Sequence, residues 1–354
     1  MRLLLAAALM LAGCGPAPTV ATGPRATATV APTATPNFDD MMGAAPAATV
    51  FVVSGPELLA VTLLNHAVRY RITLSDDPQV ATSPDGARLF VADRTGTDLR
   101  LRSYDVVTGQ ALAQTTEPLE DRALVETGSA RGAIAVDAYR LLVLRHAATG
   151  LLVHAYDAVR LIPVGTPTKN DGCATRLLAS AAEYALVCPA GEGIYLFWDE
   201  NGRQQGGIAP IAGPLAGAAM WQDGKIASVH AFGDLRLVRA RGTAALALSP
   251  NDWVKTAVGL DGLAWADQFT LVVAESDPAV ARPRIHVIDT TTYRTRRFDL
   301  PSRPANGILA FGQFAYWVAQ DASGVYHVDL QSGLVEKMYG PLEKGASLGA
   351  LAVR

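Results

Sequence analysis

A short strand that ends in aspartate and a tight turn recurs along most of the sequence. Its copies read SYDVVTG, AYDAVR, FWDENG, VIDTTTY and YHVDLQSG, and their aspartates are Asp105, Asp157, Asp199, Asp289 and Asp329. The intervals between these aspartates are 52, 42, 90 and 40 residues, and the longest interval leaves room for one degenerate copy at residues 235–242. A repeat of this length is one supersecondary unit, which needs neighbours to bury its apolar face. This periodicity constrains the fold more than any other feature.

A second motif, which combines a turn with an apolar strand, precedes these aspartates. It appears as SPDGARLFVAD at residues 83–93, and as LLASAAEYALVCP, AMWQDGKIASVHA, LAWADQFTLVVAE and LAFGQFAYWVAQ. Pro84 and Asp85 suit the centre of a turn. In the later turn, aspartate accepts backbone hydrogen bonds, while Gly109 and Gly333 supply the positive φ that closes a hairpin. Tyr293 stands where glycine is expected, so we predict a longer or differently shaped hairpin there.

Each unit thus contains four antiparallel strands in 40–50 residues, which is typical of a β-propeller blade. The stretches resemble YVTN and WD40-like propeller repeats, most clearly at residues 79–117. The resemblance covers residues 49–354 and implies an all-β fold, a single propeller of about seven four-stranded blades. Residues 347–354 have the pattern of one strand and residues 50–74 that of three. We expect the N- and C-terminal strands to pair and close the ring, which removes free sheet edges.

The N-terminus predicts export. MRLLLAAALMLAGC has one positive charge, a short apolar run and small residues before a cysteine, which is typical of a signal peptide. LAGC resembles the lipobox of bacterial lipoproteins, which implies a signal peptide at residues 1–13 and a lipid on Cys14. The protein would be anchored in the cell membrane or outer membrane, facing the periplasm or the cell exterior. The alternative is an ordinary cleaved signal that contains a cysteine.

Residues 14–48 are rich in proline, threonine and alanine without apolar periodicity. Such a segment cannot bury enough surface to fold, so we expect a disordered tether. The propeller domain follows at residues 49–354. With a formal net charge of −3 and 18% charged residues, the chain has no basic excess to replace the counterions of phosphates, which argues against nucleic acid as a partner.

Two further cysteines suggest a disulfide. Cys173 and Cys188 flank a predicted hairpin centred on Ser180 and Ala181, so they would face each other. An oxidising cell envelope permits a disulfide between them. The alternative is a pair of buried free thiols, because cysteine packs well as a small apolar residue.

Histidines and aromatic residues recur at equivalent positions. His154, His286 and His327 fall in the third strands of three different blades; such positions lie far apart in a propeller, so no metal site is predicted from them. Trp221, Trp265 and Phe311 each end a first strand. We expect these aromatic rings to pack between blades; the alternative is a stacking surface for a sugar or peptide.

A polar ligand would bind to the loops that join second to third strands and successive blades. Their charged residues are the candidate ligand-face residues: Asp93, Arg94, Lys169, Asp171, Glu275, Asp277, Arg282 and Arg303. Loop charges are mostly solvated, but binding residues in scaffolded folds also concentrate there.

The sequence contains no HExxH, EF-hand or CxxC motif. We therefore expect a monomeric, non-enzymatic module that binds an envelope protein or polymer, and no cofactor is identified. The alternatives are an envelope component without a ligand and a propeller enzyme, either a metal-dependent lactonase-like hydrolase or a quinone-dependent dehydrogenase. Such an enzyme would need polar groups converging on the central channel, with Glu126, Asp171 and Glu275 as possible contributors. A propeller fold alone does not establish a reaction.

Overall fold

The computed structural model describes most of the chain from residue 48 to residue 353. The gaps are 120–123, 126, 128, 148–149, 171–173, 182, 189–194, 199–203, 208–214, 231–234, 240–245, 249–260 and 276–281. The predictions for the signal peptide, Cys14 and nearly all of the tether lie outside the described residues. The described part is all-β and contains no helix that could cross a membrane.

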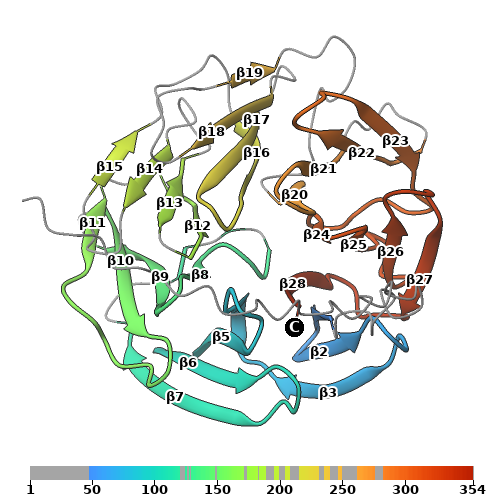
Figure 1. The fold of residues 1–354 in the computed structure, drawn as a ribbon. Helices are drawn as coiled ribbons and strands as arrows, with labels where there is room; N and C mark the ends of the chain where they lie inside the picture. Colours follow the sequence, from blue (N-terminus) through green and yellow to red (C-terminus); the bar gives the residue numbers. More distant parts are fainter. Residues whose placement is uncertain are drawn as a thin grey trace, which may run out of the picture. The chain divides into compact units, whose positions relative to one another are not determined.

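The described strands form seven four-stranded antiparallel sheets, which are the blades of a β-propeller (Figure 1). Six blades each use four consecutive strands. Blade 1 contains β4 (Asp76–Thr82), β5 (Arg88–Thr95), β6 (Asp98–Asp105) and β7 (Ala111–Pro118). Blade 2 contains β8 (Ile134–Val136), β9 (Arg140–Ala147), β10 (Gly150–Asp157) and β11 (Thr168–Asn170). Blade 3 contains β12 (Arg176–Ala179), β13 (Tyr184–Val187), β14 (Tyr195–Trp198) and β15 (Gln204–Gly207).

The next three blades repeat this order. Blade 4 contains β16 (Leu215–Met220), β17 (Lys225–His230), β18 (Leu235–Arg239) and β19 (Leu246–Leu248). Blade 5 contains β20 (Leu263–Trp265), β21 (Thr270–Ala274), β22 (Arg284–Asp289) and β23 (Thr295–Asp299). Blade 6 contains β24 (Leu309–Phe311), β25 (Phe314–Val318), β26 (Val325–Asp329) and β27 (Val335–Tyr339).

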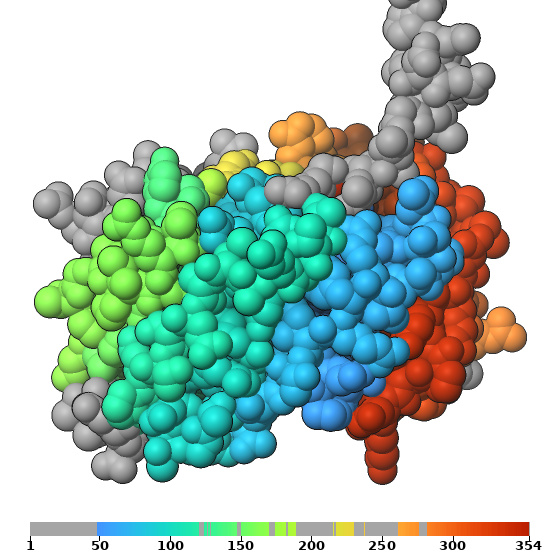
Figure 2. All heavy atoms as spheres, turned by 90° about the horizontal axis from the view of Figure 1, so that it is seen from below, coloured from blue at the N-terminus to red at the C-terminus, as the bar shows by residue number. Residues whose placement is uncertain are grey.

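The seventh sheet, the closing blade, combines both ends of the domain. Its order is β28 (Ser347–Ala352), β1 (Thr49–Ser54), β2 (Glu57–Thr62) and β3 (Val68–Thr73). The predicted pairing of the terminal strands is present, because β28 and β1 are antiparallel partners with a bulge between Phe51 and Val52. Innermost strands contact one another in the order β4, β8, β12, β16, β20, β24 and β28, and β28 contacts β4. In Figure 2 the blue residues of the closing blade lie between the red C-terminal strands and blade 1.

Apolar side chains pack between the blades rather than in one central core. The buried residues form seven clusters, and each joins two neighbouring blades. Strand β1 shows why: Val50 and Val52 pack against blade 6, while Phe51 and Val53 point the opposite way and pack against blade 1. Successive residues of a strand point to opposite faces, so a strand buried on both faces must be apolar throughout. This arrangement accounts for a sequence that is 50% hydrophobic.

The aspartate turns at the four described positions form as predicted, with one correction, and the predicted turn at Asp199 lies outside the described residues. Asp105 Oδ1 accepts hydrogen bonds from the backbone N of Val107 (3.0 Å) and Thr108 (2.8 Å). The same pattern occurs at Asp157, Asp289 and Asp329. The prediction of a different hairpin at Tyr293 is wrong: its φ is 59°, close to the 70° of Gly109, and its backbone N donates to the carbonyl of Asp289 at 2.8 Å. The aspartate holds the turn strongly enough to keep a tyrosine in the left-handed region.

Candidate functional site

The innermost strands of all seven blades line a central cavity of about 440 Å³. Most of the lining is apolar, including Val80, Ile134 and Leu177. The charged residues in the described lining are Arg131, Arg176 and Asp261. Each stands at or just before the start of an innermost strand, so the three gather at one end of the channel. This end also receives the loops that enter each blade, which is where a ligand was predicted.

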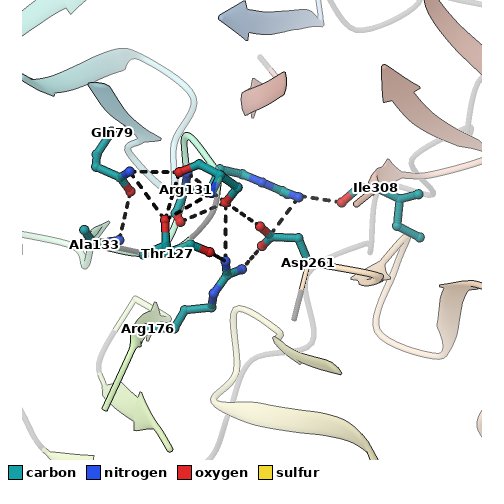
Figure 3. A network of polar contacts seen from close by, with 8 residues as sticks. Gln79, Thr127, Arg131, Ala133, Arg176, Asp261 and Ile308 are labelled. Atoms are coloured by element: carbon teal, nitrogen blue, oxygen red, sulfur yellow. Dashed lines mark hydrogen bonds and ion pairs between the residues drawn. The ribbon is translucent and has the colours of Figure 1, made fainter. Parts of the chain in front are cut away.

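The three charged side chains form one network across the channel (Figure 3). Arg176 Nη1 donates a hydrogen bond to Asp261 Oδ1, and its Nη2 lies 3.3 Å from Ser129 Oγ. Arg131 Nη2 lies 3.5 Å from the same Asp261 Oδ1, while Arg131 Nη1 donates to the backbone carbonyl of Ile308 at 3.1 Å. Ser129 Oγ donates to the other carboxylate oxygen, Oδ2, at 2.7 Å. Residues of four blades and their connections thus meet at one point.

Two backbone features let these side chains approach each other. Gly132 has a φ of +101°, and a Cβ on it would lie 2.8 Å from Cγ of Arg176. Gly307 has a φ of +115°, and its Cβ would lie 2.3 Å from Cβ of Asp261. A larger residue would be strained at either position and would collide with the network, so glycine is required there.

A buried glutamine holds the loop that carries Arg131. Gln79, on β4, donates from Nε2 to the carbonyl of Ser129 at 2.9 Å and accepts a hydrogen bond from Ala133 N at 3.0 Å through Oε1. Both groups of its amide are therefore used. This bracing places Arg131 at the channel as a fixed element of the site.

Among the described residues, the network carries an excess of buried positive charge. Two guanidinium groups share one carboxylate, and the exposed fractions of the Arg131, Arg176 and Asp261 side chains are 13%, 3% and 12%. Burial lowers the pKa of Arg131 to about 10; burial, together with the charge of Arg131, lowers the pKa of Arg176 to about 9. The Nε atoms of both arginines are buried without a hydrogen-bond partner among the described residues. An anion bound in the adjoining cavity would offset this excess charge.

The residues predicted for the ligand face do not form this site. The prediction that Asp93 lies on an exposed loop is wrong, because β5 continues to Thr95 and the connecting turn is only Gly96 and Thr97. Asp93 is 0% exposed. It lies directly across from Arg100 on β6, and its carboxylate binds both Arg100 and Arg102.

The other candidate ligand-face residues are dispersed. Arg94 lies on β5 and forms an exposed ion pair with Asp77 at 3.2 Å. Glu275 lies 3.3 Å from Nε2 of His286. Lys169 is exposed on β11, Arg282 is 77% exposed and 4.0 Å from Asp299, and Arg303 is partly buried before β24. Asp171, Asp277 and Glu126 lie outside the described residues.

The three predicted aromatic residues line the other end of the cavity. Trp265 is 5% exposed, packs between blades 4 and 5, and donates from Nε1 to the carbonyl of Ala219 at 3.2 Å. Trp221 and Phe311 are partly buried, so part of each side chain remains accessible. The channel therefore has a cationic end and an aromatic end. A stacking role for these rings stays a prediction.

The cysteine hairpin differs in register from the prediction. β12 and β13 pair Arg176 with Val187 and Ala179 with Tyr184, which moves the turn about one residue toward the C-terminus. Cys188 then comes opposite residue 175 rather than Cys173. Cys188 is 1% exposed and disulfide-bonded; Cys173 lies outside the described residues, so the pairing of the two stays a prediction.

The residues of the cationic end were not identified from the sequence. A usable signal was nevertheless present, since RGAIA at residues 131–135 and DGLAW at residues 261–265 each place a charge and a glycine directly before an apolar first strand. Reading the starts of the innermost strands in this way would have found Arg131 and Asp261.

Comparisons with known proteins support the fold. No family model and no curated protein matches the chain. Among solved structures, U3-55K is similar with a TM-score of 0.55 and 11% identity, over 86% of this chain and 92% of that chain. AztD from Citrobacter koseri has a TM-score of 0.54 and 15% identity, over 84% and 83%. A chain of the mitotic checkpoint complex has a TM-score of 0.54 and 13% identity, over 81% and 79%. At such low identity these likenesses show the β-propeller fold alone.

Proposed function

We propose that this chain is an exported, lipid-anchored β-propeller that binds an envelope protein or polymer without catalysing a reaction. Its partner places an anionic group, a carboxylate in the first instance, at the cationic end of the channel. The observation that carries the proposal is the pair of buried guanidinium groups, Arg131 and Arg176, for which Asp261 is the one shared carboxylate among the described residues. Guanidinium matches a carboxylate in shape and charge, and it keeps its proton near neutral pH.

Binding is favoured over catalysis by the composition of the described lining. Asp261 is the one carboxylate among those residues, and its two oxygens already accept hydrogen bonds from Arg176 and Ser129. A metal-dependent hydrolase would need several free carboxylate, amide or imidazole ligands at the channel. A protein partner is supported by the fold, because one structure of similar fold is a chain of the mitotic checkpoint complex.

Defined anions test the binding site directly. We expect succinate or inorganic phosphate to bind the full chain saturably in isothermal titration. Arg176→Met and Arg131→Met should weaken binding at least about tenfold, because each removes a charge-assisted hydrogen bond from a buried site. Arg160→Met is the matched control, since Arg160 is exposed in a turn of blade 2. No saturable binding, or equal binding by the three variants, would contradict the proposal.

The membrane anchor requires a separate experiment. In a bacterial host, the wild-type chain should fractionate with membranes and incorporate labelled fatty acid, whereas Cys14→Ala should do neither. The support is the lipobox-like LAGC sequence and the apolar run before it. Multiple acyl chains hold a protein on a membrane where a single chain binds only weakly. Equal labelling of the wild type and Cys14→Ala would contradict the anchor and leave the channel site untouched.

A further inference from the structure

One group of three potential metal ligands lies close together within the described part of the chain. The residues are His66, His327 and Glu336, and their ligand atoms all lie within 4.8 Å of one another. None of the three lines the central cavity. The equivalent histidines His154, His286 and His327 were predicted to lie far apart. That prediction does not conflict with this group, because His66 and Glu336 are not among those equivalent positions.

Two of the ligands are held by neighbouring strands of blade 6. His327 on β26 lies directly opposite Glu336 on β27, and His327 Nε2 is 3.3 Å from Glu336 Oε2. In a tetrahedral site with metal–ligand bonds of about 2.1 Å, adjacent ligand atoms are about 3.4 Å apart. This pair already has the separation that one ion requires.

The third ligand comes from the closing blade. His66 lies in the turn between β2 and β3, with a φ of 56°, and its backbone N donates to the carbonyl of Thr62 at 3.1 Å. Its ring meets the ring of His327 edge-on, with the centroids 5.4 Å apart. The ligand nitrogen of His66 lies within 4.8 Å of the ligand atoms of His327 and Glu336.

The surroundings hold the site in place and leave it open on one side. The ring of Phe314 stacks on His327 with centroids 5.2 Å apart, and the side chain of His327 is 12% exposed. Glu336 is 49% exposed. A rigid imidazole beside an accessible carboxylate provides both a fixed ligand and an entry path from solvent.

We propose that His66, His327 and Glu336 bind one divalent transition-metal ion, zinc in preference, and that the ion fastens the closing blade to blade 6. Two imidazoles and a carboxylate are a recognised ligand set for zinc, with a fourth position left to water. The ion would connect residue 66 to residues 327 and 336 across the junction where the two ends of the domain meet. Because the unfolded chain does not hold these ligands together, zinc would stabilise the folded state.

Titration of the full chain, purified in detergent without chelator, tests the site. Isothermal titration should show one equivalent of Zn²⁺ bound, and the melting temperature should rise with zinc concentration. His66→Asn and His327→Gln should each weaken binding at least about tenfold; asparagine is used at residue 66 because it tolerates a positive φ. His146→Gln is the matched control, an exposed histidine on β9 outside the group.

The wild-type protein alone provides a second readout. Zinc should slow the modification of His66 and His327 by diethyl pyrocarbonate, measured by mass spectrometry, and leave His146 unaffected. Absence of one-equivalent uptake, unchanged affinity in His66→Asn, or unprotected His66 and His327 would each overturn the proposal. Anion binding at Arg131 and Arg176 is a separate measurement and does not depend on the outcome.

Discussion

Two buried clusters in this propeller contain the same groups, two arginines and one aspartate, but use them differently. In the Asp93 cluster, between blade 1 and the closing blade, the carboxylate accepts four hydrogen bonds, at 2.6–2.9 Å. The donors are Ser75 N, Arg100 Nε and Nη2, and Arg102 Nη2. In the Asp261 cluster, at the channel, the carboxylate accepts one hydrogen bond from Arg176 and one from Ser129, while Arg131 stays at 3.5 Å.

The pKa shifts point in opposite directions. The hydrogen bonds from Arg100 to Asp93 raise the pKa of Arg100, whereas burial lowers the pKa of Arg131 and Arg176 to about 10 and about 9. The first cluster therefore stabilises its arginine charge, whereas the second, within the part of the chain that the structure describes, leaves its charges incompletely compensated beside a cavity. We infer that the Asp93 cluster contributes to stability and that the Asp261 cluster is arranged for a ligand.

Asp93→Asn should have the largest effect on stability. It leaves Arg100 and Arg102 without a counter-charge at a site where the aspartate is fully buried, so the free energy of unfolding should fall by about 3–5 kcal/mol. Urea denaturation of the full chain measures it. The control is Asp76→Asn on the same blade, whose ion pair with Arg94 is exposed and should contribute less than about 1 kcal/mol. If both variants lost the same free energy of unfolding, the Asp93 cluster would contribute no more to stability than an exposed ion pair.

Arg102→Met should lower the free energy of unfolding by about 2 kcal/mol. Arg102 donates to Asp93 and, at 3.0 Å, to the carbonyl of Thr73, so the substitution removes both hydrogen bonds and leaves the buried carboxylate with one arginine. The loss is smaller than for Asp93→Asn because Arg100 and Ser75 N still hold the aspartate. Denaturation of the single and double variants gives the coupling between residues 93 and 102. Additive effects would contradict a shared network.

The two clusters also differ in what the sequence could reveal. The repeat gave seven blades and the terminal pairing, because turn residues and apolar strands recur at fixed intervals. Asp93 was predicted to lie on a loop, although its cross-strand partner could be derived from the sequence. A hairpin centred on Gly96 and Thr97 places Asp93 opposite Arg100. The prediction for the turn at Tyr293 was wrong for a related reason. It gave more weight to the missing glycine than to the aspartate that holds the turn.

The channel site was harder to predict because its parts come from distant positions. Ser129 and Asp261 belong to connections and Arg176 begins β12, and no local pattern shows that they meet. Their convergence depends on how each connection enters its blade, which is a tertiary property. The metal ligand group has the same origin, since His66 and His327 are brought together only by the closing blade beside blade 6.

Asp261→Asn should lower the free energy of unfolding by about 1 kcal/mol, well below the effect of Asp93→Asn. The cavity beside Asp261 can admit water to hydrate the two guanidinium groups once their counter-charge is lost. The same variant should bind phosphate more tightly than the wild type, because the site then has two uncompensated positive charges. Its melting temperature should consequently rise more steeply with phosphate concentration. A large loss of stability without tighter binding would make Asp261 a structural residue like Asp93.

Arg176→Met should change the free energy of unfolding least, with a value near zero or slightly stabilising. A guanidinium that is 3% exposed costs desolvation free energy that an apolar side chain of similar length does not. Ser129 Oγ continues to donate to Asp261 at 2.7 Å, so the carboxylate keeps one partner.

Arg102→Met and Arg176→Met make the same chemical change at the two clusters. Denaturation measured in parallel should give a clear loss of stability for Arg102→Met and none for Arg176→Met. Anion binding should show the opposite pattern: Arg176→Met should lose it, and Arg102→Met should retain it. If both variants lose similar stability and both still bind the anion, the arginines of the channel are structural and the partner must bind elsewhere on the propeller.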